Sequence, residues 1–547
     1  ELKENPGFDC VIGNPPYVGF HGFEDIKLYL KQIYQSCSGK YDIYIPFIEL
    51  FIRILKTHGK GSYICPSGFM KRDHGKQLRT LLKSDATIEF LHDFRDYQVF
   101  KGATNYTCIL VVSNSHASNN YDFKASFGDD LCAPKITVNT KHVLSEEGWN
   151  ITADNFLVKI QSSERTVPLK EIASVIAEGI VTGQNDVFII DKNNKCDNSI
   201  LAENEVIRKA LRGETVDRYE IKWDNTYLIY PYKLACKKTI PLSEEELKSY
   251  SNAYQYLSKK RDNLIGRNYF DNSSKYWFEL WNQRDLLHLS SRKIVVQENS
   301  AKNEFVIANG EYFYLDTCCG ITIKAESGLS DLYVLAVLNA NLLDFIFKQI
   351  TVPKAGGHYI HKPMFLERLP IARIFFTTPK EERKKEVGDA MRFCEALEQV
   401  NILKWSEQEL TRKRNDTIHD LLAYLAEQMI EMNKKKNEEI KGFLKWFERE
   451  IGAEIDNLAN KTAVKEYHET DFNQLLEVLK KNRNKVSIDP SDRKTQELLE
   501  NQFAKSMSIL EPLKARIKAT DELIDEIVYR LYGLTEEEIK VVKGEVS

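Results

Sequence analysis

A short apolar run that ends in two consecutive prolines constrains the fold of this chain more than any other feature. It reads FDCVIGNPPYVGF and occupies residues 8–20 of the 547. Residues 8–12 favour a strand, and the two prolines remove two backbone donors and fix two φ angles, so the strand must end there. Open α/β sheets bind ligands outside the carboxyl ends of their strands. The sequence therefore predicts a ligand site at Asn14, and a proline turn after a buried strand is the plain structural alternative.

The residue types in this loop suit methyl transfer to the exocyclic amine of a base. The lone pair of adenine N6 is delocalised into the ring, so the amine is a poor nucleophile until acceptors localise that pair. The side-chain carbonyl of Asn14 and the backbone carbonyl of Pro15 can accept hydrogen bonds from the two N–H groups of the amine. These bonds would aim the nitrogen lone pair at a methyl donor. Tyr17 offers a ring on which the base can stack.

The stretch FDCVIGNPPY resembles motif IV of amino-methyltransferases that use S-adenosyl-L-methionine, in the form typical of N6-adenine DNA methyltransferases. Further stretches resemble later motifs of the TaqI-like adenine methyltransferases, and they follow in the expected order. These are KYDIYIPFIE at residues 40–49 for motif V, GSYICPSGFM at residues 61–70 for motif VI, and VFKGATNYTCILVV at residues 99–112 for motif VIII.

The resemblance assigns roles to individual residues by their positions in these motifs. It implies that the catalytic loop consists of Asn14, Pro15, Pro16 and Tyr17, and that Asn14 also contacts the cofactor. Phe47 matches the aromatic residue of motif V that packs against the adenine of the cofactor. Tyr17 and Phe100 match the residues that stack on the target base. The structural alternative for both phenylalanines is an ordinary core position.

Beyond about residue 150 the sequence changes to short strand-like segments and turns. Four stretches resemble, in order, the target-recognition domain of TaqI-like and type IIG restriction-modification proteins. They are EGIVTGQNDVFIID at residues 178–191, IRKALRGETVDRY at 207–219, SRKIVVQENSAKNEFVIANGEYFYLDT at 291–317, and LYVLAVLNANLLDFIF at 332–347. Asn339-Ala340-Asn341 departs slightly from the closing pattern of that domain. The resemblance implies that this region recognises double-stranded DNA.

The order of these segments predicts the fold class and three domains. Over residues 1–150 helical and strand patterns alternate, which predicts an α/β domain, the second half of a Rossmann-like methyltransferase sheet. We expect an α+β target-recognition domain over residues 151–375 and a helical bundle or coiled coil over residues 376–547. In the family, the glycine-rich loop and the acidic ribose ligand of the cofactor site precede motif IV. We therefore expect this chain to be the carboxy-terminal portion of a larger protein.

Composition limits the class of protein and the cellular compartment that we expect for this chain. The hydrophobic fraction of 42% and the charged fraction of 29% are those of a globular protein, and no apolar run approaches a membrane span or a signal peptide. We therefore expect a cytoplasmic protein without a membrane partner. The ten cysteines form no CxxC pair, so no metal site is expected. The net charge of -4 is unusual for a DNA-binding protein, and basic pairs such as Arg292-Lys293 are expected either to line a groove or to be solvated.

These features together predict part of a site-specific DNA N6-adenine methyltransferase of a restriction-modification or phage-defence system. The chain alone is expected to be inactive. Its expected partners are double-stranded DNA and the upstream half of the same protein, which would also hold any nuclease domain. One alternative is a non-catalytic DNA-specificity module that works with a separate catalytic chain. Another is a methyltransferase that acts on RNA or on protein glutamine, because NPPY loops occur there too.

The charged helices of residues 376–547 have two possible roles. The first is a scaffold for the other domains. The second is a clamp on the DNA backbone through Arg412, Lys413 and Arg414.

Overall fold

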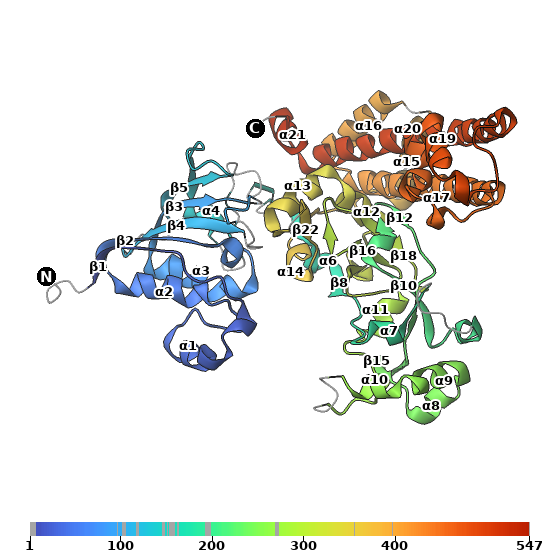
Figure 1. The fold of residues 1–547 in the computed structure, drawn as a ribbon. Coiled ribbons are helices and arrows are strands. Elements are labelled where there is room, and N and C mark those ends of the chain that lie inside the picture. Colours follow the sequence, from blue (N-terminus) through green and yellow to red (C-terminus); the bar gives the residue numbers. More distant parts are fainter. Residues whose placement is uncertain are drawn as a thin grey trace.

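The computed structural model of the protein contains two bodies that lie side by side (Figure 1). It describes residues 7–95, 97–100, 106–115, 120–144, 148–149, 151, 159–160, 163–191, 198–267, 273–354, 356–396 and 398–545. The first body is built around one sheet and lies toward the N-terminus. The second body combines a β-rich part with the helices that follow it in sequence.

A six-stranded mixed sheet organises the first body. Its strand order is β1-β2-β4-β3-β5-β6, with β1 parallel to β2, β4 antiparallel to β2 and β3, and β3 parallel to β5. The strands are β1 (Phe8–Gly13), β2 (Leu55–Pro66), β3 (Thr87–Asp93), β4 (Thr107–Ser113), β5 (Asp122–Phe127) and β6 (Ile136–Asn139). Because β1, β2 and β3 run in the same direction, their carboxyl ends meet at one edge of the sheet. The loop with Asn14 lies at that edge.

Helices α2 (Tyr44–Ile54) and α3 (Lys76–Asp85) pack on this sheet, and the shorter α1 (Lys27–Ile33) lies below them (Figure 1). The buried side chains of α2 include Tyr44, Ile48, Phe51 and Ile52, which recur at helical spacing. Apolar periodicity predicts a helix over residues 42–56. The helix in the structure is shorter because Leu55 already pairs with Phe8 as part of β2.

Two four-stranded sheets form the β-rich part of the second body. Their orders are β19-β10-β13-β9 and β18-β16-β20-β8. The strands are β8 (Ala173–Glu178), β9 (Ile189–Ile190), β10 (Ile207–Leu211), β13 (Tyr227–Ile229), β16 (Lys293–Gln297), β18 (Phe305–Ala308), β19 (Tyr312–Tyr314) and β20 (Cys318–Ile323). β16 lies between two apolar cores, because Val295 faces one core while Ile294 and Val296 face the other.

Long helices form most of the chain after residue 380, which confirms the expected helical character of this region. They are α15 (Lys380–Glu395), α16 (Gln399–Thr411), α17 (Asn415–Ile451), α18 (Lys461–Lys465), α19 (Phe472–Lys481), α20 (Arg493–Tyr532) and α21 (Glu536–Lys543). The first half of α17 and the second half of α20 share a core with α12 (Asp331–Asn339) and α13 (Asn341–Ile350). The other halves of α17 and α20 enclose a separate core around Phe443 and Tyr467.

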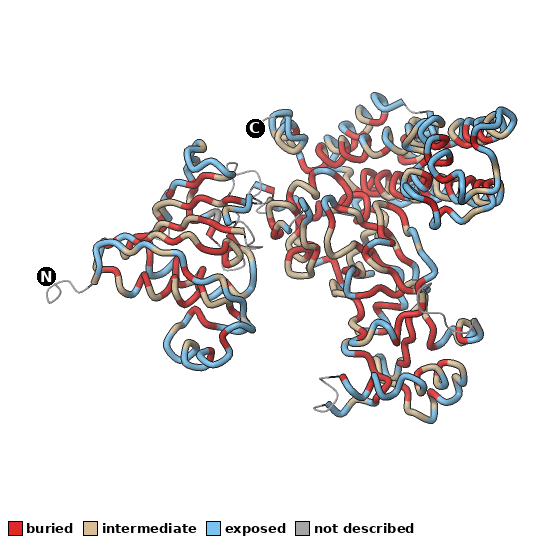
Figure 2. Tube along the Cα trace, viewed as in Figure 1, coloured by how far each residue is buried: buried red, intermediate tan, exposed pale blue. Residues whose placement is uncertain are grey.

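The shared core crosses the domain boundary predicted at residue 376. It joins apolar side chains of α12, such as Val334 and Leu338, to those of α17, such as Leu422, and of α20, such as Ile527. Figure 2 shows buried segments both in the β-rich part and in these helices. The three domains stay a prediction, and the helices nearest the boundary pack as part of the second body.

α12 is buried on all sides, because residues Tyr333 through Asn339 are all buried. Among the described residues no single helix is both long and apolar enough to cross a membrane. The bent pair α12 and α13, which meet at 71°, meets that test by length and composition only. Both helices lie in the shared core described above.

The structure corrects the expectation for the basic pair Arg292-Lys293. Lys293 is buried, and its ammonium donates hydrogen bonds to the carbonyl oxygens of Leu289 at 2.7 Å and Ser291 at 3.0 Å. Burial lowers the pKa of Lys293 to about 7. Arg292 pairs with Asp331 at 2.6 Å. Lys293 therefore neither lines a groove nor belongs to a solvated face, because β16 begins in the interior.

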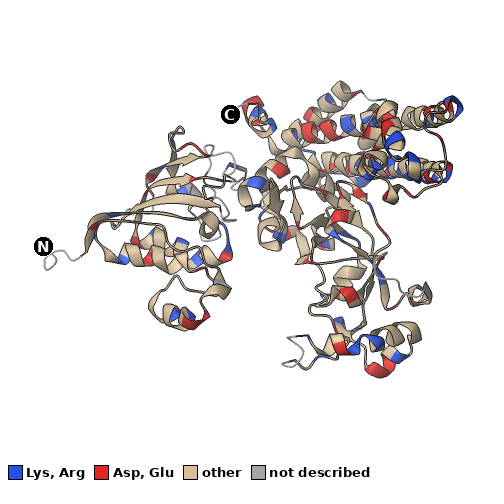
Figure 3. Ribbon diagram, in the orientation of Figure 1, with Lys and Arg blue, Asp and Glu red and all other residues tan. Residues whose placement is uncertain are grey.

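Charges of both signs are interspersed along the helices (Figure 3). Arg412 pairs with Glu409 at 2.9 Å, and Arg414 pairs with Glu382 at 2.8 Å. Ion pairs within the protein reduce the positive charge that these side chains offer to phosphates. The clamp role of residues 412–414 therefore stays a hypothesis that no contact in the described structure supports.

Candidate active site

The predicted catalytic loop begins where β1 ends, at Gly13. Asn14 is exposed and Pro15 is buried, so the first proline fixes the backbone while the carboxamide faces outward. A Cβ atom at Gly13 would lie 2.8 Å from the ring of Tyr63, which is itself buried. Only glycine permits this approach, and it allows the chain to pass over Tyr63 directly before Asn14.

Tyr17 is anchored to the neighbouring strand. Its hydroxyl donates a hydrogen bond to the carbonyl oxygen of Ile64 in β2 at 3.1 Å. Burial raises the pKa of the Tyr17 phenol, and Cys65 and Cys108 raise it further. The phenol therefore stays protonated and keeps this bond at any physiological pH. The bond fixes the ring relative to the end of β2.

The structure brings Tyr17 and Phe100 together. Their ring centroids lie 6.0 Å apart, and the ring planes meet at 72°, which is an edge-to-face contact. Phe100 is 36% exposed. In this arrangement the two rings touch each other and leave no parallel slot for a base. Their stacking role stays a prediction, and residues 101–105 of the motif VIII stretch lie outside the described residues.

Phe47 lies in the first turns of α2. Its side chain is partly buried against the apolar core of the first body. Within the described ranges, no hydrogen bond or ring contact joins Phe47 to the catalytic loop. The loop is tied to the same region through Ile43, whose N–H donates to the carbonyl oxygen of Val18 at 3.0 Å. A cofactor contact by Phe47 stays a prediction.

A polar cluster beside the loop was missed by the sequence analysis. Nε2 of His74 lies 3.9 Å from a carboxylate oxygen of Asp42 and 3.2 Å from the hydroxyl of Tyr44. Burial lowers the pKa of His74, and the Asp42 carboxylate opposes this shift. Asp42 immediately precedes Ile43, which holds the loop. The cluster joins Asp42 and Tyr44, which lie two residues apart around the start of α2, to a histidine 30 residues after Tyr44, so no local pattern reveals it.

The exposed side of β1 bears on whether the residues at the end of this strand fit S-adenosyl-L-methionine. Phe8 is 59% exposed and Ile12 is 81% exposed, although both are large apolar side chains (Figure 2). Within the described part of the chain, β1 pairs with β2 alone. Asn14 and the exposed edge of β1 thus suit one wall of a pocket for S-adenosyl-L-methionine.

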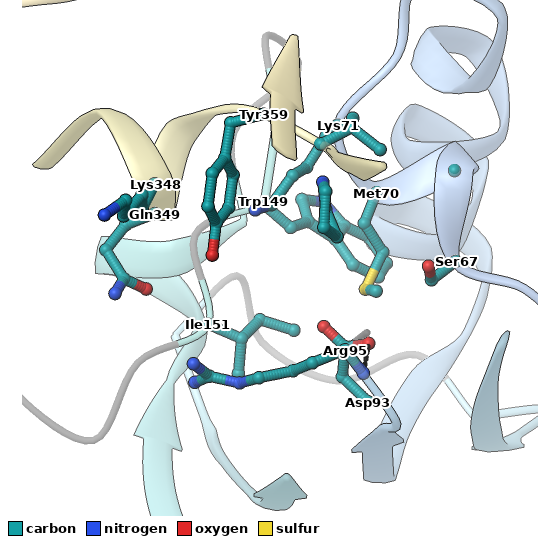
Figure 4. Close-up of a pocket in the computed structure, with 13 residues that line it drawn as sticks. Ser67, Met70, Lys71, Asp93, Arg95, Trp149, Ile151, Lys348, Gln349 and Tyr359 are labelled. Atoms are coloured by element: carbon teal, nitrogen blue, oxygen red, sulfur yellow. Dashed lines mark hydrogen bonds between the residues drawn. The ribbon is translucent and has the colours of Figure 1, made fainter. Parts of the chain in front are cut away.

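A pocket lies between the two bodies, at the edge of the first sheet where the carboxyl ends of β2 and β3 meet (Figure 4). Its cavity volume is about 200 Å³. The first body contributes Ser67, Gly68, Met70, Lys71, Asp93, Arg95, Trp149 and Ile151, and the second contributes Lys348, Gln349, Val352, Pro353 and Tyr359. The ammonium of Lys71 donates to the carbonyl oxygen of Thr351 at 2.7 Å and so links the bodies.

The fold and the loop define the class of this protein: a mixed α/β body with an Asn-Pro-Pro-Tyr loop, joined to a β-rich body and helices. Residues 1–100 match the Eco57I restriction-modification methylase family. Residues 208–371 match the TaqI-like C-terminal specificity domain. Residues 412–528 match a domain of unknown function. The first two matches confirm the resemblance drawn from the motifs.

Curated relatives of the chain are type II restriction-modification methyltransferases. The chain is 26% identical over 428 residues to the type II restriction enzyme and methyltransferase RM.Eco57I of Escherichia coli, with 71% of this chain and 42% of that protein covered. It is 24% identical over 340 residues to the methyltransferase M.BstVI of Geobacillus stearothermophilus, with 56% and 57% covered. The chain thus spans about half the length of these relatives.

Solved structures of restriction-modification enzymes are also similar to the chain. The type IIL enzyme MmeI in complex with DNA matches with a TM-score of 0.46 and 11% identity, over 77% of this chain and 57% of that one. The type IIG restriction endonuclease BpuSI matches with a TM-score of 0.29 and 14% identity, over 69% of this chain and 48% of that one.

Proposed function

We propose that this chain is part of a site-specific DNA N6-adenine methyltransferase of a restriction-modification or phage-defence system. In the complete protein it would transfer a methyl group from S-adenosyl-L-methionine to an adenine rotated out of double-stranded DNA. The observation that carries the proposal is the loop at the carboxyl end of β1. There Asn14 is exposed, Pro15 is fixed, and Tyr17 is anchored to Ile64.

The loop supplies the acceptors that this reaction needs. The side-chain oxygen of Asn14 and the backbone oxygen of Pro15 would accept hydrogen bonds from the two N–H groups of adenine N6. These hydrogen bonds would draw the lone pair of N6 out of the ring. When bound, S-adenosyl-L-methionine supplies an electrophilic methyl group. Two preorganised acceptors stabilise the amine only as it becomes tetrahedral, so they favour the transition state over the bound substrate.

Rotation of the adenine out of the duplex follows from the position of the loop. A stacked base cannot reach a loop at a sheet edge, so the base must leave the helix at a cost of a few kcal/mol. The rings of Tyr17 and Phe100 lie side by side at the loop and offer aromatic surfaces for the base. Stacking on them would offset part of that cost. The β-rich body, which matches the specificity domain over residues 208–371, would select the DNA sequence.

The partner proposed for the open edge of β1 is the upstream half of the same protein. An exposed apolar strand edge is normally covered, because it otherwise pairs with other chains. Phe8 and Ile12 on β1 would be covered by further strands that carry the remaining cofactor contacts. The isolated chain would then be inactive because half of the cofactor pocket is supplied elsewhere.

The experiment that tests the function measures methyl transfer by the complete protein that contains this chain. Replacing Asn14→Ala removes one of the two acceptors, so turnover should fall on the order of 100-fold or more. DNA affinity should change little. The tritium-labelled methyl group transferred to an adenine-containing duplex is the readout. Gln77→Ala, which removes an exposed carboxamide from α3, is the matched control and should retain turnover. Near-normal transfer by the Asn14 variant contradicts the assignment.

A further inference from the structure

The pocket between the two bodies collects positive side chains from both of them (Figure 4). Lys71 and Arg95 come from the first body, and Lys348 comes from α13 of the second. Asp93 is the one carboxylate among the lining residues of the described chain. Lys348 is paired with Asp344 at 2.7 Å, but Lys71 and Arg95 still outnumber Asp93. Positive charge is therefore in excess around a cavity of about 200 Å³, which favours an anionic group.

Lys71 has no carboxylate partner within ion-pair distance among the described residues. Its ammonium donates to the carbonyl oxygen of Thr351 at 2.7 Å, which leaves two further donors. Desolvation lowers the pKa of Lys71 to about 8; Asp93 opposes this shift, and Arg95 and Arg368 add to it. An anion in the pocket would compensate both the desolvated ammonium and the repulsion among these cations.

Arg95 reaches the pocket from an unusual backbone conformation. Its φ is 53°, in the left-handed region that a residue with a Cβ rarely adopts. The carboxylate of Asp93 accepts the N–H of Arg95 at 3.0 Å and holds this turn at the end of β3. The guanidinium lies 4.5 Å from the ring centre of Phe127. The turn and this stacking contact direct the side chain along the floor of the pocket (Figure 4).

The second body contributes an oriented cation and an amide. The ammonium of Lys348 lies 2.7 Å from a carboxylate oxygen of Asp344 and 5.5 Å from the ring centre of Tyr359. Gln349 and Tyr359 face the same cavity (Figure 4). Lysine, arginine, glutamine and tyrosine side chains are the groups that contact phosphate oxygens in protein–DNA complexes.

We infer that this pocket binds a phosphate ester, held between Lys71 and Arg95 of the first body and Lys348 of the second. A backbone phosphate of the DNA substrate is the expected source, and this part rests on the proposed function; a free nucleotide offers the same chemistry. Ser67 in the lining follows Ile64, the anchor of Tyr17, by three residues. An extended chain rises about 3.3 Å per residue, so Ser67 lies roughly 10 Å from Ile64. The pocket is therefore within a few nucleotides of the flipped base along the DNA.

The test measures the affinity of the full-length protein for a duplex as a function of salt concentration. Each neutralised phosphate contributes about 0.9 to the slope of log affinity against log salt. Arg95→Gln and Lys348→Gln should each lower the magnitude of that slope by about 0.9, and the double variant should lower it by the same amount, because both side chains contact one phosphate. Two independent phosphates would instead give about twice the change in the double variant.

The matched control is Lys60→Gln. Lys60 lies in β2 opposite Ser113, the last residue of the antiparallel β4, and therefore at the opposite edge of the sheet; it pairs with Glu89 at 2.7 Å. Its removal should leave the salt slope unchanged. Lys71→Met is a further variant, and thermal melting of all variants verifies that they are folded.

A second measurement identifies the source of the phosphate. Titration with adenosine monophosphate and with inorganic phosphate should give no saturable binding if DNA is the ligand, while the salt slope responds as described. Saturable nucleotide binding that is lost in Arg95→Gln would assign the same site to free nucleotides. Unchanged slopes together with no nucleotide binding overturn the inference. Methyl transfer by the wild-type protein, measured in parallel, shows whether the proposed function itself stands.

Discussion

At the scale of single residues, the proposed catalytic loop combines an exposed carboxamide with an anchored aromatic neighbour. Asn14 is free to meet a substrate, whereas Tyr17 is fixed through its hydroxyl to Ile64. Phe100 meets Tyr17 edge-on. A base that enters beside Tyr17 must therefore displace or rotate the ring of Phe100, which is more exposed and has no hydrogen bond to hold it.

This geometry predicts separate effects for the two rings on base flipping. With 2-aminopurine in place of the target adenine, the complete protein should raise the fluorescence of the duplex, because the base leaves the stack. Phe100→Ala should give a smaller rise, since one aromatic surface that is worth about 1–3 kcal/mol of stacking is lost. Phe90→Leu, a change at a partly buried ring of β3 in the same sheet, is the control. Equal fluorescence for Phe100→Ala and the wild type would mean that Phe100 is only a packing residue.

At the scale of elements, α20 completes the start of α13. The residue before α13 is Ala340, which has no side chain that can cap the helix. Asp525 of α20 takes this role, because its carboxylate accepts the backbone N–H of Asn341 at 2.7 Å and the side-chain amide of Asn341 at 2.5 Å. α20 is therefore part of the second body, although 184 residues separate Asp525 from Asn341.

The cap predicts a specific pH dependence of stability. Burial raises the pKa of Asp525, Asp521 adds to this shift, and Asn341 and Arg218 oppose it; the resulting pKa is about 7. Between the ordinary aspartate pKa and about 7 the folded state binds the proton more tightly than the unfolded state. The free energy of unfolding should therefore fall as pH rises through this window, by at most about 1.4 kcal/mol per pH unit.

Denaturant unfolding at pH 5 and pH 8 tests this prediction. Asp525→Asn cannot ionise, so its stability relative to the wild type should improve from pH 5 to pH 8. Asp525→Ala loses the cap and should be less stable at both values, by about 1–2 kcal/mol. A wild-type protein that gains stability over Asp525→Asn as the pH rises would show that the carboxylate form is the favoured one.

At the scale of the whole molecule, the site is shared among parts that are distant in sequence. The first body supplies the loop and the open edge of β1, and the second supplies the other side of the pocket and the region that matches the specificity domain. Because Phe8 and Ile12 remain exposed, the described chain offers one wall of the proposed cofactor pocket.

The open wall predicts that residues 1–547 alone bind S-adenosyl-L-methionine without useful affinity. Polar groups of the cofactor that face no partner lose about 1–3 kcal/mol each on burial, so an incomplete pocket cannot retain them. Calorimetric titration of the isolated chain should detect no micromolar binding, whereas titration with duplex DNA should give heat. Micromolar binding of the cofactor would show that its site lies elsewhere in this chain.

The local features of the first body could be predicted from sequence because they depend on near neighbours. The prolines after Ile12 end β1, and the apolar spacing around Phe51 produces α2. The order of the motifs indicated a resemblance to restriction-modification methylases and to TaqI-like specificity domains, which the comparisons confirm for residues 1–100 and 208–371. Such patterns depend on backbone geometry and on periods of two to four residues, so they are visible in a linear sequence.

Only the tertiary structure decided how the loop, the pocket and the end of the chain are connected. Tyr17 meets Ile64 across 47 residues, Asp525 meets Asn341 across 184, and Lys71 meets Thr351 across 280. It also placed Lys293 in the interior, where sequence indicated a surface cation. These contacts form only when separate elements pack, because a side chain selects its partner from whatever the fold brings within hydrogen-bond distance, and no local pattern records that distance.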